Sequence, residues 1–261
     1  MNSRTPLPNS VRYHAGNWET LGAGVIVETP VTLTVNGHVW LTFMCTPTDL
    51  EALAIGFLYN EGVIKSREEI ELVKVCPTGD NVDIWLKRAV EQPQQWRRTS
   101  GCTGGATAVS LDQIRPELKD GLLLTPQLVQ SLLKNLTEEQ VLYREVGGVH
   151  TSILSDGDRV VISAEDIGRH NSLDKIAGRC VLDNIKLMRK ILVTTGRISS
   201  DMIQKAARIG AAIVISRTSA SSLSVTLADK WGITLIGYAR HDQFIIYTHP
   251  ERVKQQTMVL A

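Results

Sequence analysis

The sequence predicts an α/β protein in which a three-layer C-terminal part follows a smaller α+β N-terminal part. Two observations predict this fold class. In the second half, short apolar runs alternate with amphipathic stretches, which is typical of parallel strands covered by helices. In the first half, two pairs of β-rich runs flank one helical stretch. We therefore expect a flexible arm over residues 1–22, an N-terminal domain over 23–115 and a C-terminal nucleotide- or cofactor-binding domain over 116–261.

The N-terminal elements follow from turn and spacing signals. Asn36-Gly37 separates two β-rich runs, and both residues tolerate the positive φ of a tight hairpin turn. Apolar residues then recur at helical spacing from Leu50 to Leu58, with Thr46 or Thr48 expected as the cap. Gly62 is expected to end that helix. A second strand pair is predicted around a Thr-Gly-Asp turn, over residues 71–76 and 81–88.

The C-terminal elements begin with a helix over residues 126–136, where a threonine caps the start and proline takes the first helical position. Two strands, near 149–154 and 158–163, flank Asp156-Gly157. From there the elements alternate in type. We expect helices over 171–182, 199–209 and 220–231, and strands over 190–195, 211–216, 233–238 and 244–248.

Composition excludes several classes of protein. The 261 residues carry 28 basic and 27 acidic side chains, so the basic excess typical of a phosphate-tracking nucleic-acid binder is missing. The first 16 residues do not resemble a signal peptide, and no apolar run approaches the ~18 residues of a membrane helix. The four cysteines lie far apart. We therefore expect a cytoplasmic protein with reduced thiols and no membrane or nucleic-acid partner.

The segment Ser100–Gly105 is the first candidate for chemistry. Three glycines surround Cys102, so another molecule could approach its sulfur closely, and backbone N–H groups could stabilise a thiolate or persulfide. The alternative is a glycine-rich turn that holds an inert thiol.

Polar residues also gather where the apolar strands end and where the helices begin. Such junctions lie at the carboxyl ends of parallel strands, where α/β proteins bind ligands, and their N–H groups and guanidinium groups suit phosphate. Ordinary helix caps and a structural histidine are the alternatives. No Walker A or GxGxxG motif occurs. The candidate ligand-binding residues are Gly148, His150, Asp166, Arg169, His170, Arg197, Ser199, Arg217, Tyr238 and Arg240.

Taken together, the motifs resemble those of the FdhD family, the formate dehydrogenase accessory sulfurtransferases. The strings that carry the resemblance are GGVH, EDIGRHNSLDK, TTGRISSDMIQKAARIGAAIVISRTSASSL and ITLIGYARHDQFIIYTHPER, with ETPVTLTVNG and FLYNEGVI in the N-terminal part. The similarity runs from about Gly24 to Arg252. It implies a C-terminal domain similar to cytidine deaminases, a smaller N-terminal domain and a homodimer.

The resemblance also implies a function. A family member accepts persulfide sulfur from a cysteine desulfurase and passes it to the molybdenum or tungsten bis(guanine dinucleotide) cofactor, which GDP mimics, for the catalytic subunit of formate dehydrogenase. The family's reactive cysteine matches Cys102. Its cofactor-binding segment matches Tyr238, Ala239, Arg240, His241, Asp242 and Gln243.

The chain departs from the family pattern at two positions. Gly105 replaces the second cysteine of a C-x-x-C pair, which weakens a mechanism that needs an internal disulfide but leaves a single-cysteine relay intact. Gln243 replaces an arginine, so either the phosphate contacts there are weaker or Arg240 supplies them.

Two other functions compete with the sulfur relay. A zinc-dependent nucleobase hydrolase needs an H-x-E or C-x-E motif followed by a later P-C-x-x-C, and this combination does not occur in the chain. A non-catalytic chaperone would bind the guanine dinucleotide cofactor without moving sulfur, and the missing second cysteine keeps this alternative open.

Overall fold

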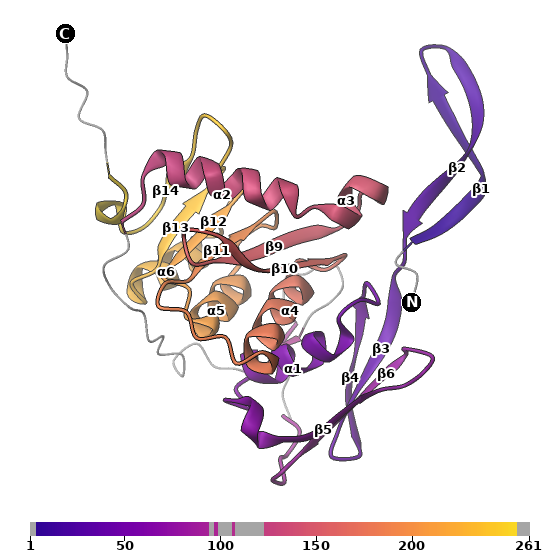
Figure 1. The fold of residues 1–261 in the computed structure, drawn as a ribbon, viewed down its shortest axis with the longest axis vertical. Coiled ribbons are helices and arrows are strands. Elements are labelled where there is room, and N and C mark those ends of the chain that lie inside the picture. The colour runs from indigo at the N-terminus through magenta and orange to yellow at the C-terminus, as the bar shows by residue number, and fades with distance from the viewer. Residues whose placement is uncertain (1–3, 94–96, 99–105, 108–122, 255–261) are drawn as a thin grey trace.

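The computed structural model describes residues 4–93, 97–98, 106–107 and 123–254, and these ranges form a mixed α/β structure, as the sequence predicted (Figure 1). The strands of the first half are β1 (Arg4–His14), β2 (Asn17–Ile26), β3 (Thr29–Val35), β4 (His38–Cys45), β5 (Ile70–Val75), β6 (Asn81–Leu86), β7 (Arg97–Arg98) and β8 (Ala106–Thr107). Those of the second half are β9 (His150–Ser155), β10 (Val160–Asp166), β11 (Ile191–Thr194), β12 (Ile213–Ser216), β13 (Thr234–Gly237) and β14 (Ile245–Ile246). The α-helices are α1 (Leu50–Asn60), α2 (Pro126–Glu138), α3 (Val141–Val146), α4 (Arg169–Leu182), α5 (Ser200–Ile209) and α6 (Ser222–Lys230).

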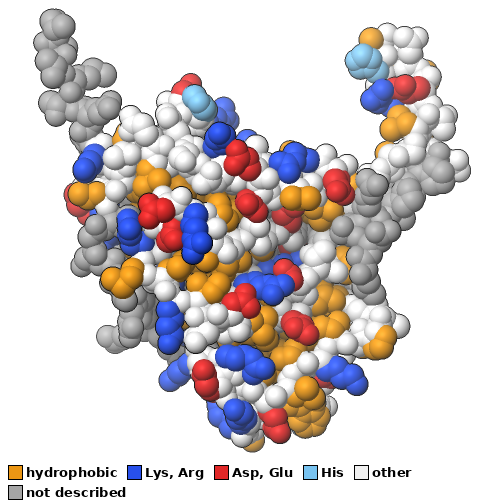
Figure 2. Space-filling view, in the orientation of Figure 1, with side chains coloured by type: hydrophobic (Ala, Val, Ile, Leu, Met, Phe, Trp, Pro, Cys, Tyr) orange, Lys and Arg blue, Asp and Glu red, His pale blue; other side chains and the backbone are white. Residues whose placement is uncertain are grey.

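An antiparallel hairpin, β1–β2, replaces the unstructured arm expected over residues 1–22. Its turn places Ala15 and Gly16 at positive φ, and the ring centroids of Tyr13 and Trp18 lie 5.0 Å apart across the strands. Because cross-strand aromatic pairs stabilise a hairpin, this short polar segment can form regular structure without helical or strong apolar periodicity. Figure 2 shows the hairpin standing clear of the body, with both signs of charge near its end.

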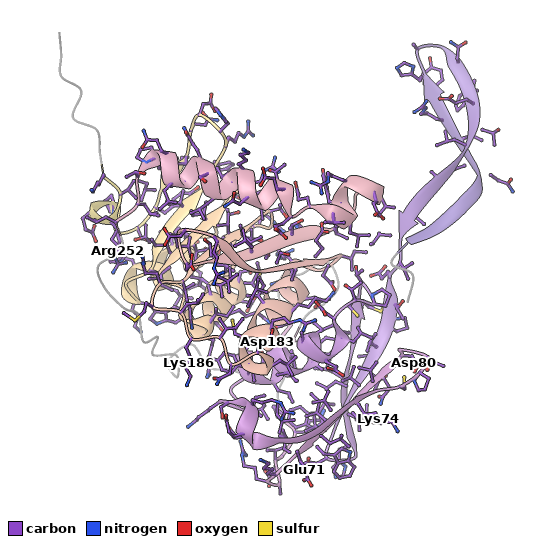
Figure 3. All side chains as sticks on the ribbon, viewed as in Figure 1. Glu71, Lys74, Asp80, Asp183, Lys186 and Arg252 are labelled. Carbon is purple, nitrogen blue, oxygen red and sulfur yellow. The ribbon has the colours of Figure 1, made fainter. Side chains whose placement is uncertain are left out.

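The N-terminal sheet has the strand order β4-β3-β6-β5, and α1 packs on one face of it. The predicted turn at Asn36-Gly37 is confirmed, because both residues adopt positive φ. Glu71 and Lys74 lie on β5, and Asp80 lies in the turn that leads to β6 (Figure 3). The helix cap differs from the prediction: Asp49, in left-handed conformation, precedes α1 and its side chain makes no capping bond.

Helices α1 and α4 cross with their backbones in contact. A Cβ atom built on Gly56 would lie 1.7 Å from the carbonyl oxygen of Asp174, and one built on Gly178 would lie 1.9 Å from that of Ala52. Only glycine permits this approach. The close crossing fixes the N-terminal sheet and its helix against the second sheet.

The second sheet has the strand order β10-β9-β11-β12-β13-β14. Its three middle strands, β11 to β13, run parallel as predicted, whereas β9, β10 and β14 pair antiparallel with their neighbours. Alternate residues of β11 face α2 on one side and α5 on the other, so helices cover both faces. This period-two burial is what an apolar central strand requires.

The C-terminal segment is tied back to the start of α2. The N–H of Leu124 donates to Arg252 O (2.8 Å), and the N–H of Lys254 donates to Leu124 O (2.8 Å). The guanidinium of Arg252, labelled in Figure 3, donates to Gly232 O and to Thr234 Oγ1. Across the described part of the chain, every helix is too short or too polar to span a lipid bilayer.

Candidate functional site

The polar junctions predicted from the sequence meet at one edge of the second sheet. Strands β11, β12 and β13 end there at Thr194, Ser216 and Gly237. Since β9 runs antiparallel to β11, its first residue, His150, lies at the same edge, and Asp166 at the end of β10 pairs with His150. The topology therefore brings together candidate residues from five separate connections.

The connection between β11 and α5 forms the middle of this edge. Thr195 Oγ1 accepts a hydrogen bond from the N–H of Thr151 (3.1 Å) and lies 3.3 Å from His150 Nδ1. Ser199 caps α5, with its Oγ accepting from the N–H of Met202 (3.5 Å). Arg197 is exposed. The junction thus presents a helix N-terminus and a guanidinium group, a combination that suits an anion.

Both site histidines favour the neutral form. Burial, followed by the positive charges of Lys205 and Arg169, holds the pKa of His170 well below its ordinary value. Burial and Arg169 also lower the pKa of His150, and Asp166 opposes this shift. His170 Nε2 lies 3.5 Å from Ser199 Oγ. A neutral imidazole can accept or donate a hydrogen bond toward a ligand without adding charge.

The loop after β13 completes the edge. Tyr238 takes a left-handed backbone conformation (φ 47°), which is uncommon for a residue with a side chain. Its N–H donates to Thr218 O (2.9 Å), and the N–H of Ala239 donates to Ser216 O (3.0 Å). The N–H of Arg240 donates to Gln243 O (2.8 Å), which closes a turn whose members include His241 and Asp242. Within the loop itself, residues 238–243, every side chain except that of Ala239 is exposed.

Two cavities open beside this loop and share Arg240. The larger, about 500 Å³, is lined by Gln140, Tyr143, Val149, Thr195, Arg217, Thr218 and Arg240. The smaller, about 290 Å³, is lined by Tyr238, Arg240, Gln243, Phe244 and Ile245. Both volumes are of the size that holds one part of a nucleotide.

Three candidate residues lie beneath the edge or beside it. Asp166 is fully buried and accepts hydrogen bonds from protein groups. Arg169 is 4% exposed, and its Cβ would be 2.8 Å from a Cβ on Gly196. Gly148, at φ 73°, lies against the side chain of Ile26 at the base of the hairpin. These positions indicate that the three residues shape the edge.

Sequence reasoning missed one wall of the larger cavity. Gln140 and Tyr143 come from the region of α3, a helix of six residues that the apolar periodicity did not predict. Glu165 accepts from the N–H groups of Leu142 (2.6 Å) and Tyr143 (3.1 Å), so its carboxylate fixes the start of this helix. The sequence contains no local signal for this long-range cap.

Cys102 and the loop around it lie outside the described residues. The other three thiols are engaged or buried. Burial, with a smaller effect of Asp166, raises the pKa of Cys45 to about 12, and burial raises that of Cys180 to about 11. Cys76 Sγ lies 2.8 Å from Asp80 Oδ1, to which it donates, and it accepts from the N–H of Asn81 (3.1 Å). Within the described ranges, no three His, Cys, Asp or Glu side chains are placed to hold a metal ion.

Comparison with known proteins decides the family. The model of the FdhD/NarQ family matches residues 26–254. The chain belongs to the FdhD/NarQ family. The family membership predicted from the motifs is therefore confirmed, and the matched range contains every candidate site residue named above.

Relatives in the family span nearly the whole chain. The sulfur carrier protein FdhD of Staphylococcus aureus (strain MRSA252) is 35% identical over 249 residues, which cover 93% of this chain and 94% of that protein. The protein of the same name from Bacillus subtilis (strain 168) is 34% identical over 250 residues, 94% of this chain and 95% of that protein. A crystal structure from Desulfotalea psychrophila, described as that of a formate dehydrogenase accessory protein, has a TM-score of 0.80 and 31% identity. The match covers 97% of this chain and 100% of the chain in that crystal structure.

Proposed function

We propose that this chain is a sulfur carrier in the maturation of formate dehydrogenase. The observation that carries the proposal is the family membership, since relatives at 34–35% identity over 93–94% of the chain are named sulfur carrier protein FdhD. The match also covers 94% and 95% of these two relatives, so nearly all of each relative corresponds to this chain. In this proposal a cysteine desulfurase supplies the sulfur, and Cys102 carries it.

Loading is an exchange between two sulfur atoms. The thiolate of Cys102 attacks the terminal sulfur of the desulfurase persulfide. A new S–S bond forms on Cys102, the donor S–S bond breaks, and the desulfurase cysteine leaves as a thiolate, so the step involves no net oxidation. The raised pKa values of Cys45 and Cys180 support this assignment, because a protonated thiol is a poor nucleophile.

The acceptor in the proposal is the molybdenum or tungsten bis(guanine dinucleotide) cofactor, bound as a substrate. The edge described above fits its nucleotide parts. Arg197, Arg217 and Arg240 are exposed there, and guanidinium groups pair with phosphate through two parallel hydrogen bonds. The cavity of about 500 Å³ lies between two of these arginines.

Complementation of a strain that lacks this chain tests the proposed function. Cys102→Ser should abolish formate dehydrogenase activity while the chain stays folded and abundant. Cys76→Ser is the matched control, because its sulfur is engaged with Asp80, and it should leave activity within about twofold. Wild-type activity in the Cys102→Ser strain would contradict the relay. Retained GDP binding in that outcome would favour the non-catalytic chaperone.

A further inference from the structure

A buried ion pair lies beneath the edge of the second sheet where the candidate ligand-binding residues gather, which we call the ligand edge. Lys175 Nζ is 2.7 Å from Asp166 Oδ2, and the two side chains are 1% and 0% exposed. The same ammonium donates to the carbonyl oxygens of Thr46 (3.1 Å) and Glu165 (3.1 Å) and lies 3.0 Å from Thr48 Oγ1. Four oxygen atoms therefore compensate for the loss of water around this charge.

The carboxylate of Asp166 is fully engaged as well. Its Oδ2 also accepts from the N–H of Thr46 (3.2 Å), and its Oδ1 accepts from the N–H of Gly168 (2.8 Å) and from Asn171 Nδ2 (2.9 Å). With every contact made to protein groups and no exposed surface, Asp166 does not reach a ligand on the edge. Asp166 therefore acts by fixing the protein groups that it bonds.

Two further hydrogen bonds join the chain around Thr46 to the junction between β10 and α4. Thr46 Oγ1 accepts from the N–H of Ile167 (3.1 Å), and Asn171 Nδ2 also donates to Met44 O (2.9 Å). We call the group Thr46, Asp166, Asn171 and Lys175 the clasp. It fastens the connection from β4 to α1, in the N-terminal part, to the junction from β10 to α4, at the ligand edge.

That junction carries two of the candidate ligand residues. Arg169 and His170 follow Gly168 directly, and the Arg169 side chain lies over Gly196 on the neighbouring junction. A shift of the junction would therefore move together the imidazole of His170 and the Arg169 side chain that packs on Gly196. The clasp is the set of contacts that fixes the backbone immediately before them.

We infer that Lys175 and Asp166 are positioning residues, which act through the clasp to set Arg169 and His170 for nucleotide binding at the edge. The inference rests on the proposed function. A purely structural role would predict that any buried pair of this kind has the same effect on binding, and the molecule contains a second such pair. Lys205 Nζ lies 2.5 and 2.6 Å from the two Asp174 oxygens, and Asn60 Nδ2 donates to one of them (2.7 Å). This second pair bonds α1 rather than the junction.

The experiment compares the two pairs by replacing each with apolar residues of similar size, which leaves no uncompensated buried charge. The clasp variant is Lys175→Met with Asp166→Leu, and the control is Lys205→Met with Asp174→Leu. GDP binding is measured by calorimetry at about pH 8, where His170 is neutral with or without the charge of Lys205, and at a temperature where each protein is fully folded. Amide hydrogen exchange is measured at Ile167 and Gly168.

The clasp variant should bind GDP at least about tenfold more weakly and lose protection at the Ile167 and Gly168 amides, whereas the control should bind within about twofold of wild type. Equal losses in both variants, or unchanged binding by a folded clasp variant, would overturn the inference.

The milder variant Thr46→Val removes only the acceptor for Ile167 and should weaken GDP binding about threefold, so the test survives if the double variant does not fold. Failure of the wild-type chain to bind GDP would contradict the proposed nucleotide site. Because the inference rests on that site, the same result would overturn it as well, whereas unchanged binding by the clasp variant overturns the inference alone.

Discussion

Burial is the main cause that lowers the pKa of His150 and His170, and positive charge adds to it, from Arg169 for His150 and from Lys205 and Arg169 for His170. Both folded-state pKa values fall below the ordinary 6.5. The native state therefore binds fewer protons than the unfolded chain as the pH drops below about 6.5. Stability from this source is fully present above that pH and is lost progressively below it.

The expected result is a melting temperature that is constant from pH 8 to about pH 7 and falls between about pH 6.5 and 5. Each histidine contributes up to about 1.4 kcal/mol per pH unit inside its own window. His170→Gln should flatten the profile, because glutamine keeps a polar group beside Ser199 but does not titrate. An identical pH profile in wild type and variant, measured by calorimetry, would rule out this origin.

At the scale of elements, the crossing of α1 and α4 joins the N-terminal sheet to the ligand edge. Gly178→Ala places a methyl group 1.9 Å from the carbonyl oxygen of Ala52, so the two helix backbones must separate. Overpacking of this kind costs about 1–3 kcal/mol, and more where only backbone can move. Urea unfolding should show that loss. Gly22→Ala, with nothing within 4 Å of the new methyl group, is the control and should stay within about 0.5 kcal/mol of wild type.

The elements also show what sequence reasoning can and cannot reach. Amphipathic helices such as α4 and buried strands such as β12 were predicted within two residues, because period and capping are local signals. The threonines expected to cap α1 instead bond the β10–α4 junction and Lys175, over a separation of more than 100 residues. Local patterns carry no information about such partners. Asp166 is a second example. Its polar motif indicated a ligand contact, whereas its hydrogen bonds are all with protein groups.

At the scale of the whole molecule, the sheet topology assembles the site. Parallel strands β11 to β13 and antiparallel β9 and β10 place five connections at one edge, which the alternation of elements predicted in outline. The wall made by α3 was not predictable, since it depends on a carboxylate from β10 that caps a helix of six residues.

The residues that line the larger cavity predict which arginines contribute to GDP binding. Arg217→Ala and Arg240→Ala each remove a guanidinium that lines the larger cavity, and each should weaken GDP binding about tenfold. Arg189→Ala removes an exposed arginine paired with Asp158, away from that lining, and should leave GDP affinity unchanged. Thermal shift at millimolar GDP measures all three, because a ligand that binds only the folded state raises the melting temperature. Equal shifts in wild type and both cavity variants would contradict the assignment of the edge.

The most direct test of the sulfur-carrier account is the sulfane sulfur content of the protein after incubation with a cysteine desulfurase and cysteine. Cyanide releases such sulfur as thiocyanate, and intact mass reports one added sulfur atom. The account predicts about one cyanide-labile sulfur per chain in the wild-type protein, located on the peptide that contains Cys102, and none in Cys102→Ser. A wild-type chain that carries no sulfane sulfur, or one that carries it equally in the Cys102→Ser variant, would contradict the account.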